Sequence, residues 1–472
     1  FLGDSVRQFS ITIGLSMAAM GVGSFLSRLI VRNILSKFIA IEILLGFVGG
    51  ISIPVLYTAY AYTNAYTFFM VMLILLIGVL IGLEIPLLTR IMEQYYVLKV
   101  NISNVLSVDY LGALIATLLF PFILLPLLGT FRSSLVFGIV NMGIGFMNLW
   151  CFSEKLHWSR RIFYRYASIS VCVVLLGLLV SSQFLIKRWS RDLYEDRVIL
   201  SKQTRYQKLV LTKNKEDIRL YLNGNLQFSS IDEYRYHEAL THIPMSMLPH
   251  HRKILILGGG DGLVVRELLK YPGIDSIDLV DLDPEMTSLA RQNPHIVRLN
   301  QNALSDPRVT VMNQDALVFL KDRVGRYDLI ISDLPDPNNV SLARLYSKEF
   351  YRLVLKHLSR EGIFVTQATS PFFAKKAFWC IHNTIQAAGF DKVLPYHVYV
   401  PSFGDWGFVI ASRRDMNPET IEISVATRYL DEPIIRRIFT FEKDLLDTTS
   451  EVSTMDRPEV MTYYFKGWRY WN

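Results

Sequence analysis

Residues 253–262 read Lys253-Ile254-Leu255-Ile256-Leu257-Gly258-Gly259-Gly260-Asp261-Gly262, and this stretch decides the fold. An apolar run of strand length passes into consecutive glycines, and a helical pattern follows from Val264 to Leu269. A strand, a glycine turn and a helix in this order place backbone amides beside a nucleotide. A plain tight turn would also explain the glycines, so the motif needs a second observation.

The next predicted strand supplies that observation. Residues 276–283 form an apolar strand pattern that ends in Asp281 and Asp283. In nucleotide-binding sheets an acid about 20 residues after the glycine run accepts hydrogen bonds from the ribose hydroxyls. A tight turn without a ligand would not need an acid at the end of the next strand. The two strands together therefore predict a ligand that contains a nucleoside.

From residue 253 onward strand and helix patterns alternate. The predicted strands are 253–258, 276–283, 309–314, 327–334, 362–369, 396–401 and 406–412. The predicted helices are 262–271, 284–292, 315–323, 346–359 and 372–388. Such alternation builds a parallel sheet with helices on both faces, so we expect a Rossmann-like α/β domain.

A small β-hairpin module precedes this domain. Strand patterns at 209–212 and 218–222 are joined by a charged turn, and Asn223-Gly224 marks the next tight turn. A helix is expected to begin near Ile231-Asp232-Glu233, because an acid suits a helix N-terminus. The expected boundaries are 196–232 for the β module, 233–415 for the Rossmann-like domain and 416–472 for a C-terminal tail.

Six acids fall where the predicted strands end, at the edge where such sheets bind ligands. They are Asp261, Asp281, Asp283, Asp315, Asp333 and Asp336. A single acid at a strand end is often a helix cap, and Asp315 alone fits that interpretation equally well. Six acids together repel one another unless cations or hydroxyl donors lie between them. The sequence therefore predicts a cationic substrate at this edge.

The first 190 residues are far more apolar than the rest. The chain of 472 residues has 51% hydrophobic residues and a mean hydropathy of +0.28, which is too apolar for a purely soluble enzyme. Six stretches have the length of about 20 residues that a bilayer crossing requires. They lie near 9–30, 38–60, 66–88, 104–128, 131–152 and 166–186. We therefore expect a multi-pass helical membrane domain over residues 1–190.

Charge gathers at the ends of these apolar stretches. The net charge of +7 therefore favours membrane anchoring over nucleic acid as a partner. The loops after the first, third and fifth stretches are basic, which predicts that they face the cytoplasm. With six crossings, everything after residue 187 would then lie outside the cytoplasm, whereas a cytosolic nucleotide ligand requires the opposite. The sequence does not decide on which side of the membrane the residues after 187 lie.

Several short segments of the second half form one combined signature. They are Tyr206-Gln207, Leu222-Asn223-Gly224 with Gln227, Asp232-Glu233-Tyr234-Arg235-Tyr236-His237-Glu238, the glycine run 258–262, Asp333-Leu334-Pro335-Asp336-Pro337 and Leu345-Tyr346-Ser347. In combination they resemble the spermidine synthase family of polyamine aminopropyltransferases over residues 198–412. The apolar first half is similar to the long, membrane-integrated bacterial members. This resemblance implies a protein of the bacterial inner membrane with a cytoplasmic catalytic domain, and a homodimer, since the family commonly forms dimers.

The resemblance implies transfer of an aminopropyl group from decarboxylated S-adenosylmethionine to a polyamine acceptor such as putrescine, giving spermidine and methylthioadenosine. The donor is a co-substrate, and neither a prosthetic group nor a metal is implied. It is a sulfonium whose propyl arm ends in an ammonium, so acids should meet it. The implied donor-binding residues are Gln207, Gly258, Gly260, Asp261, Asp281, Asp315 and Asp333. Among them, Asp281 would hold the ribose hydroxyls and Asp315 the adenine side.

The acceptor amine arrives protonated and must lose a proton before it attacks. The resemblance implies that Asp333 accepts this proton, with Tyr236 as its hydrogen-bonding partner. The implied acceptor-binding residues are Gln227, His237 and Asp336. His242, by contrast, fits a structural histidine better.

One segment departs from the family pattern. Soluble members usually carry a tyrosine near Pro401 that contacts the acceptor, whereas this chain reads Val400-Pro401-Ser402-Phe403-Gly404-Asp405-Trp406. Tyr399 or Asp405 could substitute for that tyrosine. The sequence does not show which residue does so, and the identity of the amine stays open.

Two other functions are compatible with parts of the sequence. An S-adenosylmethionine-dependent amine methyltransferase would use the same class I methyltransferase-type sheet, although Asp333 and Asp336 beside the Tyr236-His237 helix argue against it. A polyamine-binding transporter or sensor would have a membrane half and a binding half without turnover. The presence of every proposed catalytic acid favours an enzyme over both.

Overall fold

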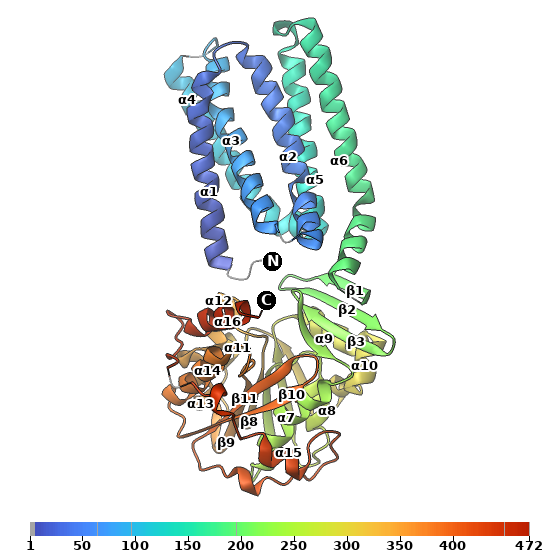
Figure 1. The fold of residues 1–472 in the computed structure, drawn as a ribbon, viewed down its shortest axis with the longest axis vertical. Coiled ribbons are helices and arrows are strands. Elements are labelled where there is room, and N and C mark those ends of the chain that lie inside the picture. Colours follow the sequence, from blue (N-terminus) through green and yellow to red (C-terminus); the bar gives the residue numbers. More distant parts are fainter. Residues whose placement is uncertain (1–4, 64, 96, 195, 448, 472) are drawn as a thin grey trace. The chain divides into compact units, whose positions relative to one another are not determined.

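The structure is a computed structural model that describes residues 5–63, 65–95, 97–194, 196–447 and 449–471. It separates into two compact units, one spanning Val6–Val198 and the other Ile199–Asn472. We call them the helical unit and the sheet unit, and Figure 1 draws both.

The helical unit consists of long apolar helices. They are α1 (Ser5–Leu26), α2 (Ile34–Tyr62), α3 (Tyr66–Met92), α4 (Leu98–Leu119), α5 (Leu125–Cys151) and α6 (Trp158–Leu193), with short turns at Ser27–Leu29, Phe120–Leu124 and Ser153–Lys155. Among the described residues, five helical stretches are long and apolar enough to cross a membrane. The unit therefore has the composition and helix lengths of a membrane-inserted bundle.

One of these stretches is too long for a single crossing. Lys99–Cys151 has 53 residues, and at 1.5 Å per residue it measures about 80 Å, whereas a bilayer core is about 30 Å thick. The backbone of Gly129 inside it is not helical, with φ at 72°. This break lies between the fourth and fifth stretches that the sequence predicts. Helical structure continues on both sides of Gly129, so the fourth and fifth predicted stretches form one run, and five stretches stand where six were expected.

Small residues let α2 and α5 pack closely. A Cβ added to Gly138 would lie 2.7 Å from the carbonyl oxygen of Gly46 and 2.8 Å from the Cα of Gly50. Backbones at this separation exclude any larger side chain, which is how membrane helices gain packing contacts without a hydrophobic driving force.

The sheet unit begins with a four-strand sheet in the order β1-β2-β3-β4. Its strands are β1 (Arg197–Gln203), β2 (Lys208–Asn214), β3 (Asp217–Leu222) and β4 (Asn225–Ser229). Between β3 and β4, Asn223 and Gly224 adopt φ angles of 51° and 88°, the left-handed values that a two-residue hairpin turn needs. The predicted tight turn is confirmed, and the predicted hairpin module is a larger sheet than expected.

A seven-strand sheet follows, in the order β10-β11-β9-β8-β5-β6-β7. Its strands are β5 (Lys253–Gly258), β6 (Ser276–Asp281), β7 (Val309–Asn313), β8 (Tyr327–Asp333), β9 (Leu358–Gln367), β10 (Lys392–Val400) and β11 (Gly404–Ser412). The first five are parallel, but β11 runs antiparallel to both β9 and β10. The prediction of a fully parallel sheet is wrong at this edge, because residues 401–403 are too few for the crossover that parallel strands require.

Helices cover both faces of this sheet. The main ones are α7 (Glu233–Ser246), α8 (Leu263–Leu268), α9 (Pro284–Gln292), α10 (Pro294–Asn300), α11 (Ala316–Asp322), α12 (Val340–Ala343), α13 (Lys348–His357) and α14 (Lys375–Ala387), and the tail adds α15 (Glu432–Arg437) and α16 (Glu459–Arg469). Strand alternation divides the core: Ile254 and Ile256 pack into one apolar cluster, and Leu255 and Leu257 into the other. The carboxyl ends of the parallel strands are left at one edge, where the acids lie.

Candidate active site

The turn between β5 and α8 brings the end of β5 against the end of β8. Gly258 and Gly259 have φ angles of 87° and 63°, which glycine adopts without strain. A Cβ on Gly258 would lie 2.1 Å from the carbonyl oxygen of Asp333, so no larger residue fits. Gly259 donates its backbone N–H to the same oxygen at 3.0 Å. The glycine run therefore holds the turn directly beside Asp333.

The carboxyl of Asp281, at the end of β6, faces the same turn. Its Oδ2 accepts the N–H of Gly260 at 3.1 Å, and its Oδ1 accepts the N–H of Asp283 at 2.8 Å. Burial raises the pKa of Asp281 to about 6, against the lowering effect of these hydrogen bonds. Backbone amides and a carboxyl thus stand together where the sequence predicts the ribose of a nucleoside.

Gln207 reaches this edge through Asp283. Its Nε2 donates to Oδ2 of Asp283 at 3.0 Å, and the hydroxyl of Thr204 donates to the same oxygen at 2.8 Å. Asp283 is buried and also accepts the N–H of Glu285 at the start of α9. These contacts tie the loop before β2 to the end of β6.

Tyr236 on α7 meets Asp333 at the end of β8. The Tyr236 hydroxyl donates to Oδ1 of Asp333 at 2.6 Å, and both side chains lie in the interior of the site. Burial raises the pKa of Asp333, whereas the charge of His237 and the Tyr236 hydrogen bond lower it. The two residues that the resemblance implies as the catalytic pair are therefore in direct contact.

His237 brings a positive charge to this group of acids. It is 3% exposed, and its Nδ1 bonds Oε2 of Glu233 at 2.8 Å. Burial alone would lower the pKa of His237, but the hydrogen bond and charge of Glu233, with smaller contributions from nearby acids, raise it to about 9. Arg266 holds Glu233 through two hydrogen bonds of 2.8 and 2.9 Å. His237 is thus an imidazolium at neutral pH.

Two further acids lie half-buried at this edge. Burial raises the pKa of Asp261 to about 6, and its Oδ1 accepts the N–H of Leu263 at 2.9 Å. Burial likewise raises the pKa of Asp336 to about 6, and its Oδ1 accepts a hydrogen bond from Nε2 of Gln367 at 3.3 Å. In the part of the chain that the structure describes, neither carboxyl forms an ion pair with an arginine or lysine. Their charge is left for a ligand.

Unlike Asp261 and Asp336, Asp315 caps a helix and pairs with an arginine. Its Oδ1 accepts the N–H groups of Leu317 and Val318 at 3.0 and 3.1 Å, which caps α11. Its Oδ2 forms an ion pair with Arg344. The helix-cap alternative is therefore confirmed, and a contact with adenine stays a prediction.

Gln227 and His242 have local partners. Nε2 of Gln227 donates to two backbone carbonyls of its own strand, each at 3.3 Å. His242 is fully buried, with its two ring nitrogens bonded to Tyr271 and Glu267 at 3.1 and 2.8 Å, as the structural interpretation predicts. Among the described residues, no group of three or more His, Cys, Asp or Glu side chains is arranged to hold a metal ion. Acid–base chemistry on a cation is what the described arrangement supports.

Comparison with known proteins identifies the family. The sequence model of the Spermine/spermidine synthase domain matches residues 233–423. A Polyamine aminopropyltransferase of Leptospira interrogans is 41% identical over 468 residues, which is 99% of this chain and 93% of that protein.

This chain belongs to the polyamine aminopropyltransferase family.

Polyamine aminopropyltransferase 2 of Ralstonia nicotianae is 42% identical over 477 residues, covering 99% of this chain and 92% of that protein. Likeness to these bacterial relatives thus includes the helical unit as well as the sheet unit. Among solved structures, Spermidine Synthase from Thermotoga Maritima is 26% identical with a TM-score of 0.48, covering 52% of this chain and 86% of that one.

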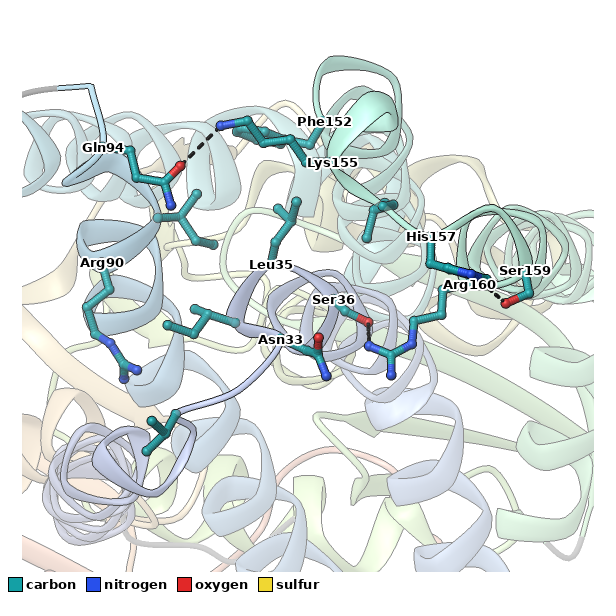
Figure 2. Close-up of a pocket in the computed structure, with 14 residues that line it drawn as sticks. Asn33, Leu35, Ser36, Arg90, Gln94, Phe152, Lys155, His157, Ser159 and Arg160 are labelled. Atoms are coloured by element: carbon teal, nitrogen blue, oxygen red, sulfur yellow. Dashed lines mark hydrogen bonds between the residues drawn. The ribbon is translucent and has the colours of Figure 1, made fainter.

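This aminopropyltransferase also has a cavity in its helical unit, of about 760 Å³ (Figure 2). Arg90, Lys155 and Arg160 are among its lining residues. Lys155 donates to Gln94 at 3.2 Å and Arg160 to Ser36 at 3.3 Å, so both cations bind neutral oxygens. No carboxylate is among the described lining residues. A cavity with basic residues and no described carboxylate in its lining does not favour an amine.

Two contacts of the site escaped the sequence analysis. Thr204 bonds Asp283, and Gln367 bonds Asp336. Thr204 and Gln367 carry no pattern that names a partner.

Proposed function

We propose that this aminopropyltransferase transfers the aminopropyl group of decarboxylated S-adenosylmethionine to a diamine such as putrescine, giving spermidine and methylthioadenosine. The observation that supports the proposal is the set of half-buried carboxyls of Asp261, Asp281 and Asp336 at one edge of the sheet, each with a pKa raised to about 6 by loss of contact with water. Buried like charges are costly until a cation joins them. Both proposed substrates are cations.

The donor would bind along the glycine turn. Asp281 lies where it can accept the ribose hydroxyls, and the lack of side chains at Gly258 and Gly260 lets the turn pack directly against Asp333 and Asp281. Gln207 would act near the donor through its hydrogen bond to Asp283, and Asp315 would face the adenine side. The carboxyls of Asp261 and Asp333 would meet the sulfonium and the ammonium of the propyl arm.

The acceptor would react beside Asp333. As its nitrogen forms a bond to the propyl carbon, the carbon–sulfur bond breaks, and the electron pair stays on sulfur in neutral methylthioadenosine. The proton lost by the amine goes to Asp333, whose position is fixed by the 2.6 Å hydrogen bond from Tyr236. In-line placement supplies the remaining rate enhancement, since a sulfonium is a good leaving group.

The charge of His237 has a separate role in this proposal. Its charge opposes the effect of burial on the pKa values of Asp333 and Asp261, and so favours the ionised form of each carboxyl. Asp336 would hold the distal ammonium of the acceptor. The predicted contacts of Gln227 and His237 with the acceptor stay predictions.

We further infer that the helical unit anchors the enzyme in the bacterial inner membrane, with the sheet unit in the cytoplasm. The nucleoside donor supports that side. The basic residues that line the cavity oppose it, because basic loops favour the cytoplasmic side. The helix α6 starts beside them at Trp158 and spans 36 residues before the sheet unit follows. A fluorescent reporter fused after Asn472 tests the side: fluorescence confined to a periplasm-active reporter would overturn the cytoplasmic placement.

The proposed reaction is tested by incubating the purified full chain with decarboxylated S-adenosylmethionine and a panel of amines. Methylthioadenosine should appear with a diamine and be absent without an amine. No release with any amine would overturn the proposal, and S-adenosylhomocysteine formed from ordinary S-adenosylmethionine would favour the methyltransferase. Labelled spermidine crossing reconstituted vesicles without turnover would favour a transporter.

A further inference from the structure

The cavity of the helical unit lies where its helices end (Figure 2). Its lining residues come from the turn between α1 and α2, the end of α3, and the turn between α5 and α6. Stretches long and apolar enough to cross a membrane end or begin at each of these places. In a membrane-inserted bundle the cavity would therefore lie at the level of the lipid headgroups.

Three cations reach the cavity from separate segments. Arg90 comes from α3, Lys155 from the turn before α6, and Arg160 from the first turn of α6. Figure 2 shows the three side chains on different sides of Leu35. One ligand in the cavity could therefore contact all three.

Neutral oxygens orient two of these cations without cancelling their charge. Nη1 of Arg90 donates to the carbonyl oxygen of Ser27 at 2.9 Å, and Nη2 donates to that of Ile30. Nη1 of Arg160 donates to the hydroxyl of Ser36 at 3.3 Å. A guanidinium has five N–H donors. Among the contacts of the described residues, each arginine thus keeps donors for a further acceptor.

The first turn of α2 adds backbone donors. Asn33 stands at the N-cap with φ at 56°, and its side chain makes no capping hydrogen bond. Residues Asn33, Ile34, Leu35 and Ser36 all line the cavity. An uncapped helix N-terminus leaves N–H groups and the positive end of the helix dipole for an anion.

The described lining supplies no acid to balance these charges. Glu93 and Glu154 are close in sequence, but both are exposed to solvent and neither is among the described lining residues. Guanidinium groups bind phosphate oxygens through paired hydrogen bonds. Three cations beside an open helix end therefore favour an oxyanion such as phosphate.

The rest of the cavity suits a ligand that also has an apolar part. Its volume of about 760 Å³ is far larger than one phosphate group. Several of its lining residues are apolar, namely Ile34, Leu35, Ile91, Phe152 and Leu156. A free phosphate ion would leave these side chains uncovered, whereas a phospholipid would cover them.

Exposed aromatic residues at the same helix ends support a lipid. Tyr95 follows α3, Trp150 lies in the last turn of α5, and Trp158 begins α6. All three side chains are exposed. Tyrosine and tryptophan are enriched at the level of the headgroups in membrane proteins.

We propose that this cavity binds the phosphate group of an anionic phospholipid. Arg90, Lys155 and Arg160 would surround the phosphate, and the apolar lining would cover the glycerol backbone and the first acyl carbons. Basic pockets between membrane helices bind acidic headgroups in this way. The inference goes beyond the proposed reaction and rests on the proposed membrane anchoring of the helical unit.

The test measures binding of phosphatidylglycerol to the detergent-purified full chain by native mass spectrometry. The wild type should bind one lipid per chain, and Lys155→Gln/Arg160→Gln should raise its Kd about ten-fold, because two charged contacts are lost. The matched control is Arg161→Gln/Arg165→Gln, which removes the same charge from exposed side chains of α6 that are not among the described lining residues. Its Kd should stay within about two-fold of the wild type.

Two further probes separate the sources of phosphate. Phosphatidylcholine, whose quaternary ammonium would meet the basic lining, should bind about ten-fold more weakly than phosphatidylglycerol. Inorganic phosphate at the concentration of the lipid should not displace it. Displacement by inorganic phosphate would overturn the lipid as the source of the phosphate group.

Equal Kd values for Lys155→Gln/Arg160→Gln and the wild type would overturn the inference. Equal losses in this variant and the control would also overturn it, because they indicate an effect of total charge. Lys155 and Arg160 are exposed, so their replacement should leave the melting temperature without lipid unchanged, and each single replacement should give part of the loss.

The inference and the proposals it stands beside fail in different ways. Wild-type protein that forms methylthioadenosine but binds no phosphatidylglycerol would overturn this inference alone. Protein recovered in the soluble fraction without detergent would overturn the membrane anchoring together with the inference.

Discussion

The acid-lined edge of the sheet unit and the basic cavity of the helical unit differ in the sign of their charges and in how far those charges are exposed to solvent. At the sheet edge, Asp261 and Asp336 are half-buried and have pKa values raised to about 6. In the cavity, Lys155 and Arg160 are exposed and bind neutral oxygens. Unpaired charge in the interior costs free energy that a counter-charged ligand recovers, whereas exposed charge is already solvated. The sign and burial of charge therefore identify the amine site better than the size of the hollow.

The largest effect is expected at Asp333. Asp333→Asn should lower kcat by about 10³-fold, since a positioned general base contributes 10² to 10⁴-fold. Stopped assays of methylthioadenosine formation measure this, and Asp306→Asn, which removes an acid paired with Arg308 at the surface, is the matched control. A kcat for Asp333→Asn within ten-fold of wild type would show that another group takes the proton.

The next effect concerns pH. Carboxyls whose pKa values are raised from near 4 to about 6 take up protons as the pH falls through 6, and then they no longer attract cations. The kcat/KM for the diamine should therefore fall about ten-fold between pH 6 and pH 5. A low-pH limb with its midpoint near 4 would mean that these acids are solvated in the working enzyme, as the cavity cations are.

Tyr236→Phe tests whether a single hydrogen bond controls the pKa of one acid at the sheet edge. The Tyr236 hydrogen bond lowers the pKa of Asp333, so its removal should raise that pKa and move the low-pH limb of kcat to higher pH. We expect kcat at neutral pH to fall about ten-fold. A lower kcat with an unmoved pH profile would assign the tyrosine to substrate placement rather than to the acid.

The smallest effect is expected in the cavity. Arg160→Ala and Lys155→Ala should leave both KM values and kcat within about two-fold, because surface charges far from a site act through screened interactions. Kinetics of the detergent-purified variants check this. A selective change in the diamine KM would connect the cavity to the reaction and remove the distinction between the two regions.

Sequence periodicity predicts most of the fold. The seven strands of the main sheet and the turn at Asn223 lie where the patterns place them, because apolar alternation and glycine or asparagine turns are local signals. The antiparallel edge was not predicted, since the short link at 401–403 was not weighed as an orientation signal. In the helical unit, helical structure continues across the kink at Gly129, so two of the six predicted stretches form one.

The candidate site was predictable only where its residues follow strands. Asp281 and Asp333 end β6 and β8, so the topology alone brings them to one edge. The cationic state of His237 depends on Glu233 and Arg266, which are joined only by tertiary packing. The docking of α16 through Val460 and Met461 depends on tertiary packing that no periodic pattern in the sequence predicts.

Calorimetry of putrescine binding at pH 6, in two buffers with different ionisation enthalpies, tests the central claim most directly. A dication that enters a group of carboxyls with pKa values near 6 lowers those pKa values, so binding should release protons at pH 6 and fewer at pH 8. Binding without proton release at pH 6, or no binding at either pH, would contradict the account.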